Sequence, residues 1–213
     1  MTPEQTILLD GLKIMGQTFW GPSLVECTEM VTEDYLNRLD SLASVLTTGA
    51  DNLLHEIGSI MRSFSDGDSL YQHLEEGYVR LFISAKGGIT APLYESCYEF
   101  EGAPLMGRAA TEMKERFETK NLSVADTIQE PPDHLSIELE YVYFLLDEGW
   151  RENDDALVAE AAEFASDRML PWISKLSEKL ASEEKCRYYP LMAAVLRQIL
   201  AVLATMNQKT PSP

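Results

Sequence analysis

The stretch Glu130-Pro131-Pro132-Asp133-His134-Leu135, which leads into the apolar-periodic segment 137–146, divides the chain into two helical parts. Neither proline fits inside a helix, because each lacks an N–H and its ring clashes with the preceding turn. The residue before a proline is also driven out of the helical region, so residues 129–132 are expected to be extended and stiff. Asp133 then stands where a helix N-cap belongs, with His134 in the first turn. The sequence predicts a rigid connector that ends in an acid and an imidazole.

Apolar residues recur at helical spacing on both sides of this connector, and strand-like alternation is nearly absent. Before the connector, helices are predicted around Leu8 to Phe19, Leu36 to Leu46, Leu54 to Phe64, Leu70 to Phe82 and Ala109 to Phe117. The first should end at Gly21-Pro22, and Thr32 should cap the second. From the connector onward, helices are predicted at 134–148, 153–169, 170–182 and 187–206. We therefore expect an all-α fold, a single bundle-like domain of about ten helices. Its parts are an N-terminal helical part (1–128), the Pro-rich connector or hinge (129–134), a C-terminal helical part (135–207) and a disordered tail (208–213).

The chain is strongly acidic, with 17 basic against 35 acidic residues and a formal net charge of −18. Nucleic-acid binding would work against this field, so no nucleic-acid partner is expected, whereas a cationic partner would be attracted. Three widely spaced cysteines favour a reducing compartment over a disulfide framework or a zinc site. The N-terminus lacks the pattern of a signal peptide, and no stretch approaches 18 uninterrupted apolar residues. These features predict a cytoplasmic protein with no membrane span.

The sequence contains no recognisable motif for catalysis or metal binding. None of the three histidines has a Glu three residues before it, as di-iron bundles require, and His55-Glu56 lacks the second histidine of a zinc-protease motif. Neither a P-loop nor a nucleophile elbow is present. We therefore expect no metal, no cofactor and no catalytic residue. Asp133 and His134 could instead act as an acid–base pair. Adjacent side chains at the start of a helix point in different directions, however, which argues against this alternative.

A second cluster surrounds the loop between residues 81 and 98. Apolar and aromatic groups stand there beside carboxylates: Tyr78, Leu81, Phe82, Pro92, Leu93, Tyr94 and Tyr98, with Glu95, Glu99 and Glu101. Such a set could form a groove for an amphipathic basic peptide. The competing interpretation is that these groups, Leu81 and Phe82 above all, are simply core.

Several of these motifs together resemble the TorD/DmsD family of cytoplasmic redox-enzyme maturation chaperones, which has NarJ-type proteins as relatives. The resemblance rests on Tyr78-x-x-Leu81-Phe82, on the segment Ala91 to Tyr98, on Glu130 to Leu135 with Glu138-Leu139, on Phe164-x-x-x-Arg168-x-Leu170-Pro171-Trp172, and on Tyr188-Tyr189 before the last helix. It spans roughly residues 70 to 206. The first 65 residues match only in their helical pattern.

The resemblance implies a system-specific chaperone without catalysis. It would bind the twin-arginine signal peptide on the apo form of a molybdopterin oxidoreductase subunit, and assist cofactor insertion and folding before export, with transient contact to the export machinery. The family's peptide-binding residues correspond to Leu81, Phe82, Pro92, Tyr94, Asp133 and His134, and we add Tyr78 and Glu95 as their neighbours. Tyr78 and Tyr94 replace the Trp of some members, which affects which leader is bound.

Two other functions remain open at this point. One is an assembly subunit that docks on the folded enzyme without leader recognition. The other is a nucleotide-hydrolysing enzyme that uses Asp133 and His134. The client, the binding of guanine nucleotide or molybdenum cofactor, and the oligomeric state (monomer or domain-swapped dimer) are not fixed by the sequence.

Overall fold

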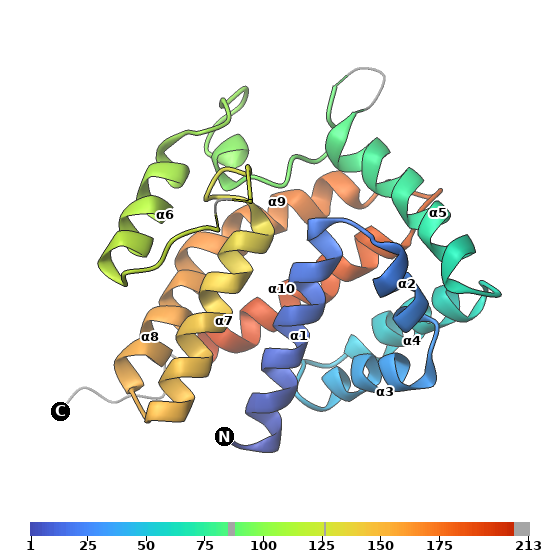
Figure 1. Cartoon of the computed structure of the whole chain (residues 1–213), viewed down its shortest axis with the longest axis horizontal. Helices are drawn as coiled ribbons and strands as arrows, with labels where there is room; N and C mark the ends of the chain where they lie inside the picture. The colour runs from blue at the N-terminus through green and yellow to red at the C-terminus, as the bar shows by residue number, and fades with distance from the viewer. Residues whose placement is uncertain (85–87, 126, 207–213) are drawn as a thin grey trace.

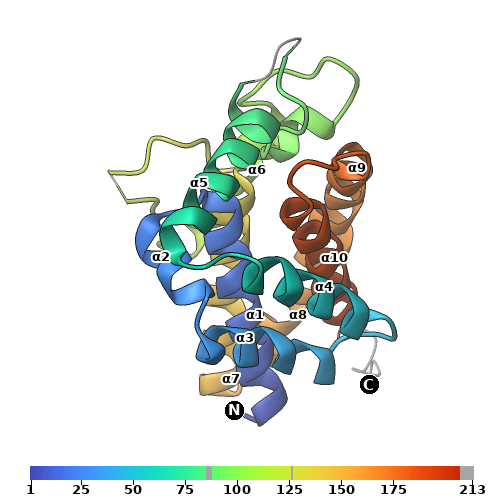
Figure 2. The ribbon, with the colours of Figure 1, turned by 90° about the vertical axis from the view of Figure 1, so that its right-hand side faces the viewer.

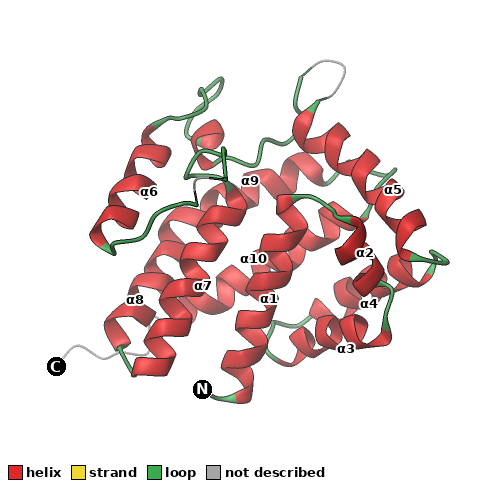
Figure 3. Ribbon diagram, viewed as in Figure 1, coloured by secondary structure: helices red, strands yellow, loops and turns green. Residues whose placement is uncertain are grey.

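The computed structural model of the chain describes residues 1–84, 88–125 and 127–206, which fold into ten α-helices, two 3-10 segments and two π-helical segments (Figures 1 and 3). This part of the chain contains no β-strand apart from one isolated bridge. The predicted all-α class is therefore confirmed. The predicted disordered tail at 208–213 lies outside the described residues.

The helices follow the predicted periodic segments closely. In chain order they are α1 (Pro3–Trp20), α2 (Leu24–Met30), α3 (Glu33–Ser41), η1 (Leu42–Ser44), α4 (Ala50–Arg62), α5 (Gly67–Tyr78), η2 (Val79–Ile83), η3 (Glu95–Tyr98), α6 (Arg108–Thr119), α7 (Leu135–Glu152), α8 (Asp155–Glu163), η4 (Phe164–Met169), α9 (Leu170–Leu180) and α10 (Tyr188–Met206).

Local capping chemistry explains where the first helices begin and end. As predicted, α1 ends at Gly21, whose φ of 111° only glycine adopts readily, and the Thr32 side chain caps α3. The helix α2, which begins at a capping box of Ser23 and Glu26, was not predicted from the sequence. This helix has seven residues and buries only two of them, so it carries too little periodicity to be recognised.

The two helical parts share one hydrophobic core. Figure 1 shows α1 and α7 side by side, and Figure 2, turned by 90°, shows α10 to the right of this pair, where it also packs against α1. The helix α10 packs against α4 from the N-terminal part and against α8 and α9 from the C-terminal part. Buried side chains on both sides of the connector therefore belong to a single cluster.

One helix in the described part of the chain, α10, is long and apolar enough to cross a membrane, with a mean hydropathy of 1.5. Ten of its residues are buried within the protein: Tyr188, Tyr189, Leu191, Met192, Ala193, Val195, Leu196, Ile199, Leu200 and Leu203. Its central place in the core accounts for this apolar composition.

Two glycine substitutions should change the stability of the protein in opposite directions, because Gly67 lies in the close contact between α2 and α5 whereas Gly16 has open space beside it. A Cβ at Gly67 would lie 2.5 Å from the Thr28 Cα, whereas a Cβ at Gly16 would meet nothing within 4 Å. Gly67→Ala should lower the free energy of unfolding by about 1–3 kcal/mol through overpacking. Gly16→Ala should raise it by about 0.5–1 kcal/mol, since alanine favours a helix interior. Urea denaturation followed by circular dichroism measures both, and equal stability of the Gly67→Ala and wild-type proteins would contradict this packing.

Candidate peptide-binding site

Two segments that lie far apart in the sequence pair through their backbones at the start of α7. Residues 93–95 run antiparallel to residues 133–135 and are joined by backbone hydrogen bonds of 2.8 and 3.1 Å. In this isolated bridge Tyr94 stands opposite His134. The structure thus brings together the loop and the connector, which the sequence analysis placed in one site.

Asp133 does not cap α7, so that prediction was wrong. The cap is His134, whose Nδ1 accepts a hydrogen bond of 3.2 Å from the Ser136 N–H. Asp133 is fully buried, and its Oδ2 accepts from the Ser96 N–H at 2.9 Å. The bridge is the reason, because it turns the Asp133 carboxylate toward the start of η3 instead of the first turn of α7.

The His134 ring lies between two aromatic side chains. The ring centroids of Trp20 and Tyr94 lie 5.1 and 5.2 Å from that of His134, and both contacts are edge-to-face. Burial lowers the pKa of His134 to about 4, against the opposing charges of Glu130 and Asp133. The imidazole is therefore neutral at pH 7. Because Nδ1 accepts a hydrogen bond, the proton is assigned to Nε2.

A cleft of about 420 Å³ opens beside this ring. Its lining comes from the ends of α1 and α5, from the connector and from the two residues before it: Trp20, Tyr78, Thr127, Ile128, Gln129, Glu130 and His134. The Tyr94 hydroxyl donates a hydrogen bond of 2.6 Å to Oε2 of Glu130, which is exposed. Aromatic and apolar surface is thus combined with one accessible carboxylate.

The other predicted peptide-binding residues near the loop lie away from this lining. Leu81 and Phe82 are 1% and 3% exposed on the π-helical segment η2. Phe82 packs edge-on against the ring of Tyr78, with centroids 5.1 Å apart. Pro92 is half-buried, and its carbonyl accepts from the Tyr98 hydroxyl. Leu81 and Phe82 are therefore core residues, and Phe82 supports the position of Tyr78.

Glu95 points into the protein, where it joins a buried cluster of charged groups. Its Oε1 lies 3.0 Å from a guanidinium nitrogen of Arg168, which is also 2.8 Å from Glu112. Glu138 is fully buried and accepts a hydrogen bond of 3.1 Å from the Trp172 indole N–H. The motif Phe164 to Trp172 thus supplies a cation and a donor to two carboxylates in the core.

Burial raises the pKa of both Glu95 and Glu138 above the ordinary range of a glutamate. Glu95 Oε2 and Glu138 Oε1 are buried without a hydrogen-bond partner among the described residues. Burial, and then the charge and hydrogen bond of Glu95, raise the pKa of Glu138 well above its ordinary range. Glu138 is therefore more readily protonated than an exposed glutamate. In the described ranges no group of three or more His, Cys, Asp or Glu is arranged to hold a metal ion.

Five residues of the cleft lining were not predicted from the sequence, namely Trp20, Thr127, Ile128, Gln129 and Glu130. Glu130 was quoted as part of the connector motif, and its position before two prolines in a stiff segment was the available signal. Trp20 lies more than a hundred residues from His134, and nothing in its own neighbourhood points to the connector. Only the packing of α1 on α7 brings it there.

The fold is shared with a protein of known structure assigned to redox enzyme maturation, from Archaeoglobus fulgidus. The two chains align with a TM-score of 0.51 and 22% identity, over 94% of this chain and 95% of the other. A search of curated proteins finds no significant match. The two proteins therefore share the same all-helical fold over nearly the whole of both chains.

Residues 35–178 match the model of the family described as nitrate reductase delta subunit. The matched region covers more than half of the chain and includes the loop, the connector and the Phe164 to Trp172 motif. The chain belongs to this family. The relationship to the NarJ-related maturation chaperones that the motifs indicated is thereby confirmed.

His134 should make the protein less stable as the pH falls from about 6.5 to about 4. In this range the unfolded chain binds a proton that the folded imidazole does not, so the free energy of unfolding rises with pH. Urea denaturation at several pH values should show a shallower dependence for His134→Asn than for the wild type. Parallel curves for the two proteins would show that His134 titrates normally in the folded state.

Arg168→Ala should lower the free energy of unfolding by about 3–5 kcal/mol, because it leaves Glu95 buried without its cation. Adding Glu95→Gln should restore a large part of the loss, since the neutral amide needs no counterion. Glu112, the other partner of Arg168, provides the control, because Glu112→Gln should rescue less. Equal losses in the single and the Glu95→Gln double variant would contradict the pairing.

Proposed function

We propose that this protein is a maturation chaperone that binds the twin-arginine signal peptide of a molybdopterin oxidoreductase subunit and assists cofactor insertion and folding before export. The observation that supports this most directly is the accessible carboxylate of Glu130 in an aromatic cleft. Membership of the nitrate reductase delta subunit family agrees with a role beside a molybdoenzyme.

The cleft offers what a guanidinium group needs. A carboxylate accepts two parallel N–H bonds from arginine, and aromatic faces attract its planar cation. Glu130 supplies the carboxylate, and Trp20 and Tyr78 supply the rings. Because His134 is neutral at pH 7, it adds no repulsive charge. These features support a contact between one arginine of the leader and Glu130.

The residues first assigned to peptide binding divide into two roles in this proposal. His134, Tyr78 and Tyr94 touch the cleft or Glu130 directly. Asp133, Glu95, Leu81, Phe82 and Pro92 act indirectly, by holding the loop and the connector in place. Substituting a residue of the second set would weaken peptide binding through misfolding, which makes it a poor test of recognition.

The acidic field of the whole chain supports the same partner. A net charge of −18 accelerates encounter with a cationic leader and repels acidic competitors. The rate of association should therefore fall as salt is added, while contacts within the cleft retain part of the affinity.

Glu130→Gln should weaken binding of a synthetic peptide carrying an Arg-Arg leader by about tenfold, because one charge-assisted hydrogen bond becomes neutral. Calorimetry at low salt measures this, with leaders from nitrate reductases tested first in view of the family. Glu115→Gln is the matched control, since Glu115 is an exposed glutamate outside the cleft.

The same measurement separates the competing functions. No binding of any Arg-Arg leader to the wild-type protein would contradict leader recognition. If a client lacking its leader then still co-purifies with the protein, an assembly subunit that docks on the folded enzyme becomes the better assignment.

A further inference from the structure

The bridge between Tyr94 and His134 closes a long excursion of the chain, and α6 is the one α-helix that the described residues form within it. Figure 1 shows α6 at the edge of the molecule. The closest contacts of its backbone with another helical element are to η3, which lies at the start of the same excursion. The helix is therefore attached to the C-terminal part of the protein mainly through its side chains.

The polar attachments of this excursion to the C-terminal part are ion pairs. Glu160 of α8 lies 2.7 Å from Lys120 Nζ and 3.8 Å from a guanidinium nitrogen of Arg116. Glu112 of α6 lies 2.8 Å from a guanidinium nitrogen of Arg168 in η4. Each of these five side chains is between 25% and 33% exposed. Ion pairs that are open to water in this way are weak and are screened by salt.

Beneath α6 lies an aromatic pair, Tyr141 of α7 and Phe164 of η4, with ring centroids 5.4 Å apart. Phe117 of α6 packs edge-on against Tyr141 at 5.7 Å, and the Arg116 guanidinium lies 5.0 Å from the centroid of the Phe164 ring. Tyr141 and Phe164 are 2% and 1% exposed. Displacing α6 would therefore uncover aromatic surface that the protein now covers.

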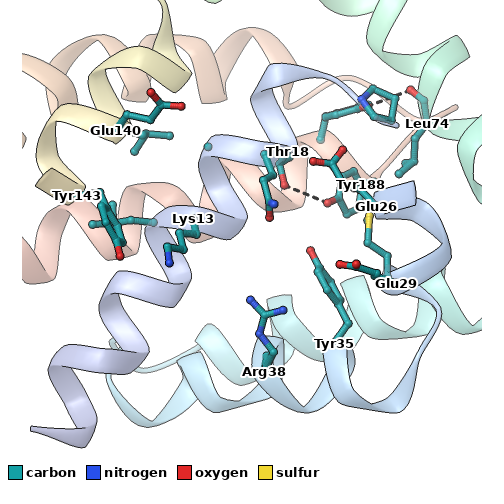
Figure 4. A pocket seen from close by; sticks show the side chains of 17 residues that line it. Lys13, Thr18, Glu26, Glu29, Tyr35, Arg38, Leu74, Glu140, Tyr143 and Tyr188 are labelled. Atoms are coloured by element: carbon teal, nitrogen blue, oxygen red, sulfur yellow. Dashed lines mark hydrogen bonds between the residues drawn. The ribbon is translucent and has the colours of Figure 1, made fainter. Parts of the chain in front are cut away.

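The opposite side of α7 faces α1. Glu140 and Tyr143 line a cavity of about 410 Å³ there (Figure 4), and the Ser136 hydroxyl donates to the Gly16 carbonyl at 2.9 Å. Tyr141 and Tyr143 are two residues apart, and therefore about 200° apart around the helix. The contact between α1 and α7 thus does not involve the surface that α6 covers, and it can persist when α6 moves.

Both ends of α6 adjoin a residue in the left-handed backbone region. Met106, two residues before the helix, has a φ of 61°, and Asn121, two residues after it, has a φ of 55°. Asparagine tolerates this region, whereas methionine is strained in it. Because Met106 is 65% exposed, the packing of its own side chain gives no reason for the strain. Element-terminal positions of this kind are suited to act as hinges.

We propose that α6 is a lid that opens as a unit about Met106 and Asn121 and uncovers Tyr141 and Phe164, while the bridge and the core remain folded. Glu160 is the latch of this lid, because it holds one cation on the helix and one beside the second hinge. The lid is a property of the chaperone alone, so it does not depend on leader binding at Glu130.

Amide hydrogen exchange of the full chain, followed by NMR, tests this proposal. The amides of residues 112–119 should exchange at one common free energy of opening, and at least about tenfold faster than those of residues 139–149 in α7. Glu160→Gln should accelerate exchange throughout α6 by about fivefold, because two partly exposed ion pairs are lost, and should leave α7 unchanged. Glutamine still accepts from the Tyr141 hydroxyl, so that hydrogen bond is retained.

Two controls accompany this comparison. Glu163→Gln removes an exposed carboxylate from the same helix as Glu160 and should change neither set of rates. Raising the salt concentration from about 0.05 M to about 1 M should accelerate α6 relative to α7 in the unaltered protein, by about threefold, and by less in Glu160→Gln. This second control does not depend on how any variant folds.

Three outcomes would overturn the lid. Equal protection of α6 and α7 in the wild type would show that α6 is released only by global unfolding. Acceleration confined to one end of α6 would show fraying of a helix that otherwise stays closed. Equal α6 rates in Glu160→Gln and Glu163→Gln would show that Glu160 does not hold the helix.

Discussion

The pairing of residues 93–95 with residues 133–135 is the constraint on which the rest of the site depends. Its two backbone hydrogen bonds set Tyr94 against His134 and turn the Asp133 carboxylate toward η3. Because side chains alternate along an extended segment, the same pairing sends Tyr94 outward and Glu95 inward. The cleft and the buried carboxylates thus lie on opposite sides of one short bridge.

The buried side of the bridge explains the motif Phe164 to Trp172. Arg168 neutralises Glu95, and Trp172 donates to Glu138, so two residues of one helical run each pair with an acidic side chain from a different segment. Taking ionised groups out of water is costly unless each is paired. This part of the family pattern therefore maintains the fold, and the proposed peptide binding depends on the residues around Glu130.

Most of the fold was predictable because apolar periodicity is a local property. The limits of α1, α3 and α10 follow from spacing and from Thr32 and Gly21, whereas α2 buries too few residues to be recognised. The site was predictable only in part. The loop and the connector were assigned to it, but the cap at His134, the inward turn of Glu95 and the place of Trp20 result from tertiary contacts that no local pattern encodes.

Because the cleft requires the contact between Trp20 and His134, it should form late in folding. Contacts between residues so distant in sequence form only after a large loop has closed, at an entropic cost that slows folding. During synthesis on the ribosome, Trp20 at the end of α1 can contact His134 only after the connector and α7 have emerged. The cleft is therefore complete only once most of the chain has been made and folded.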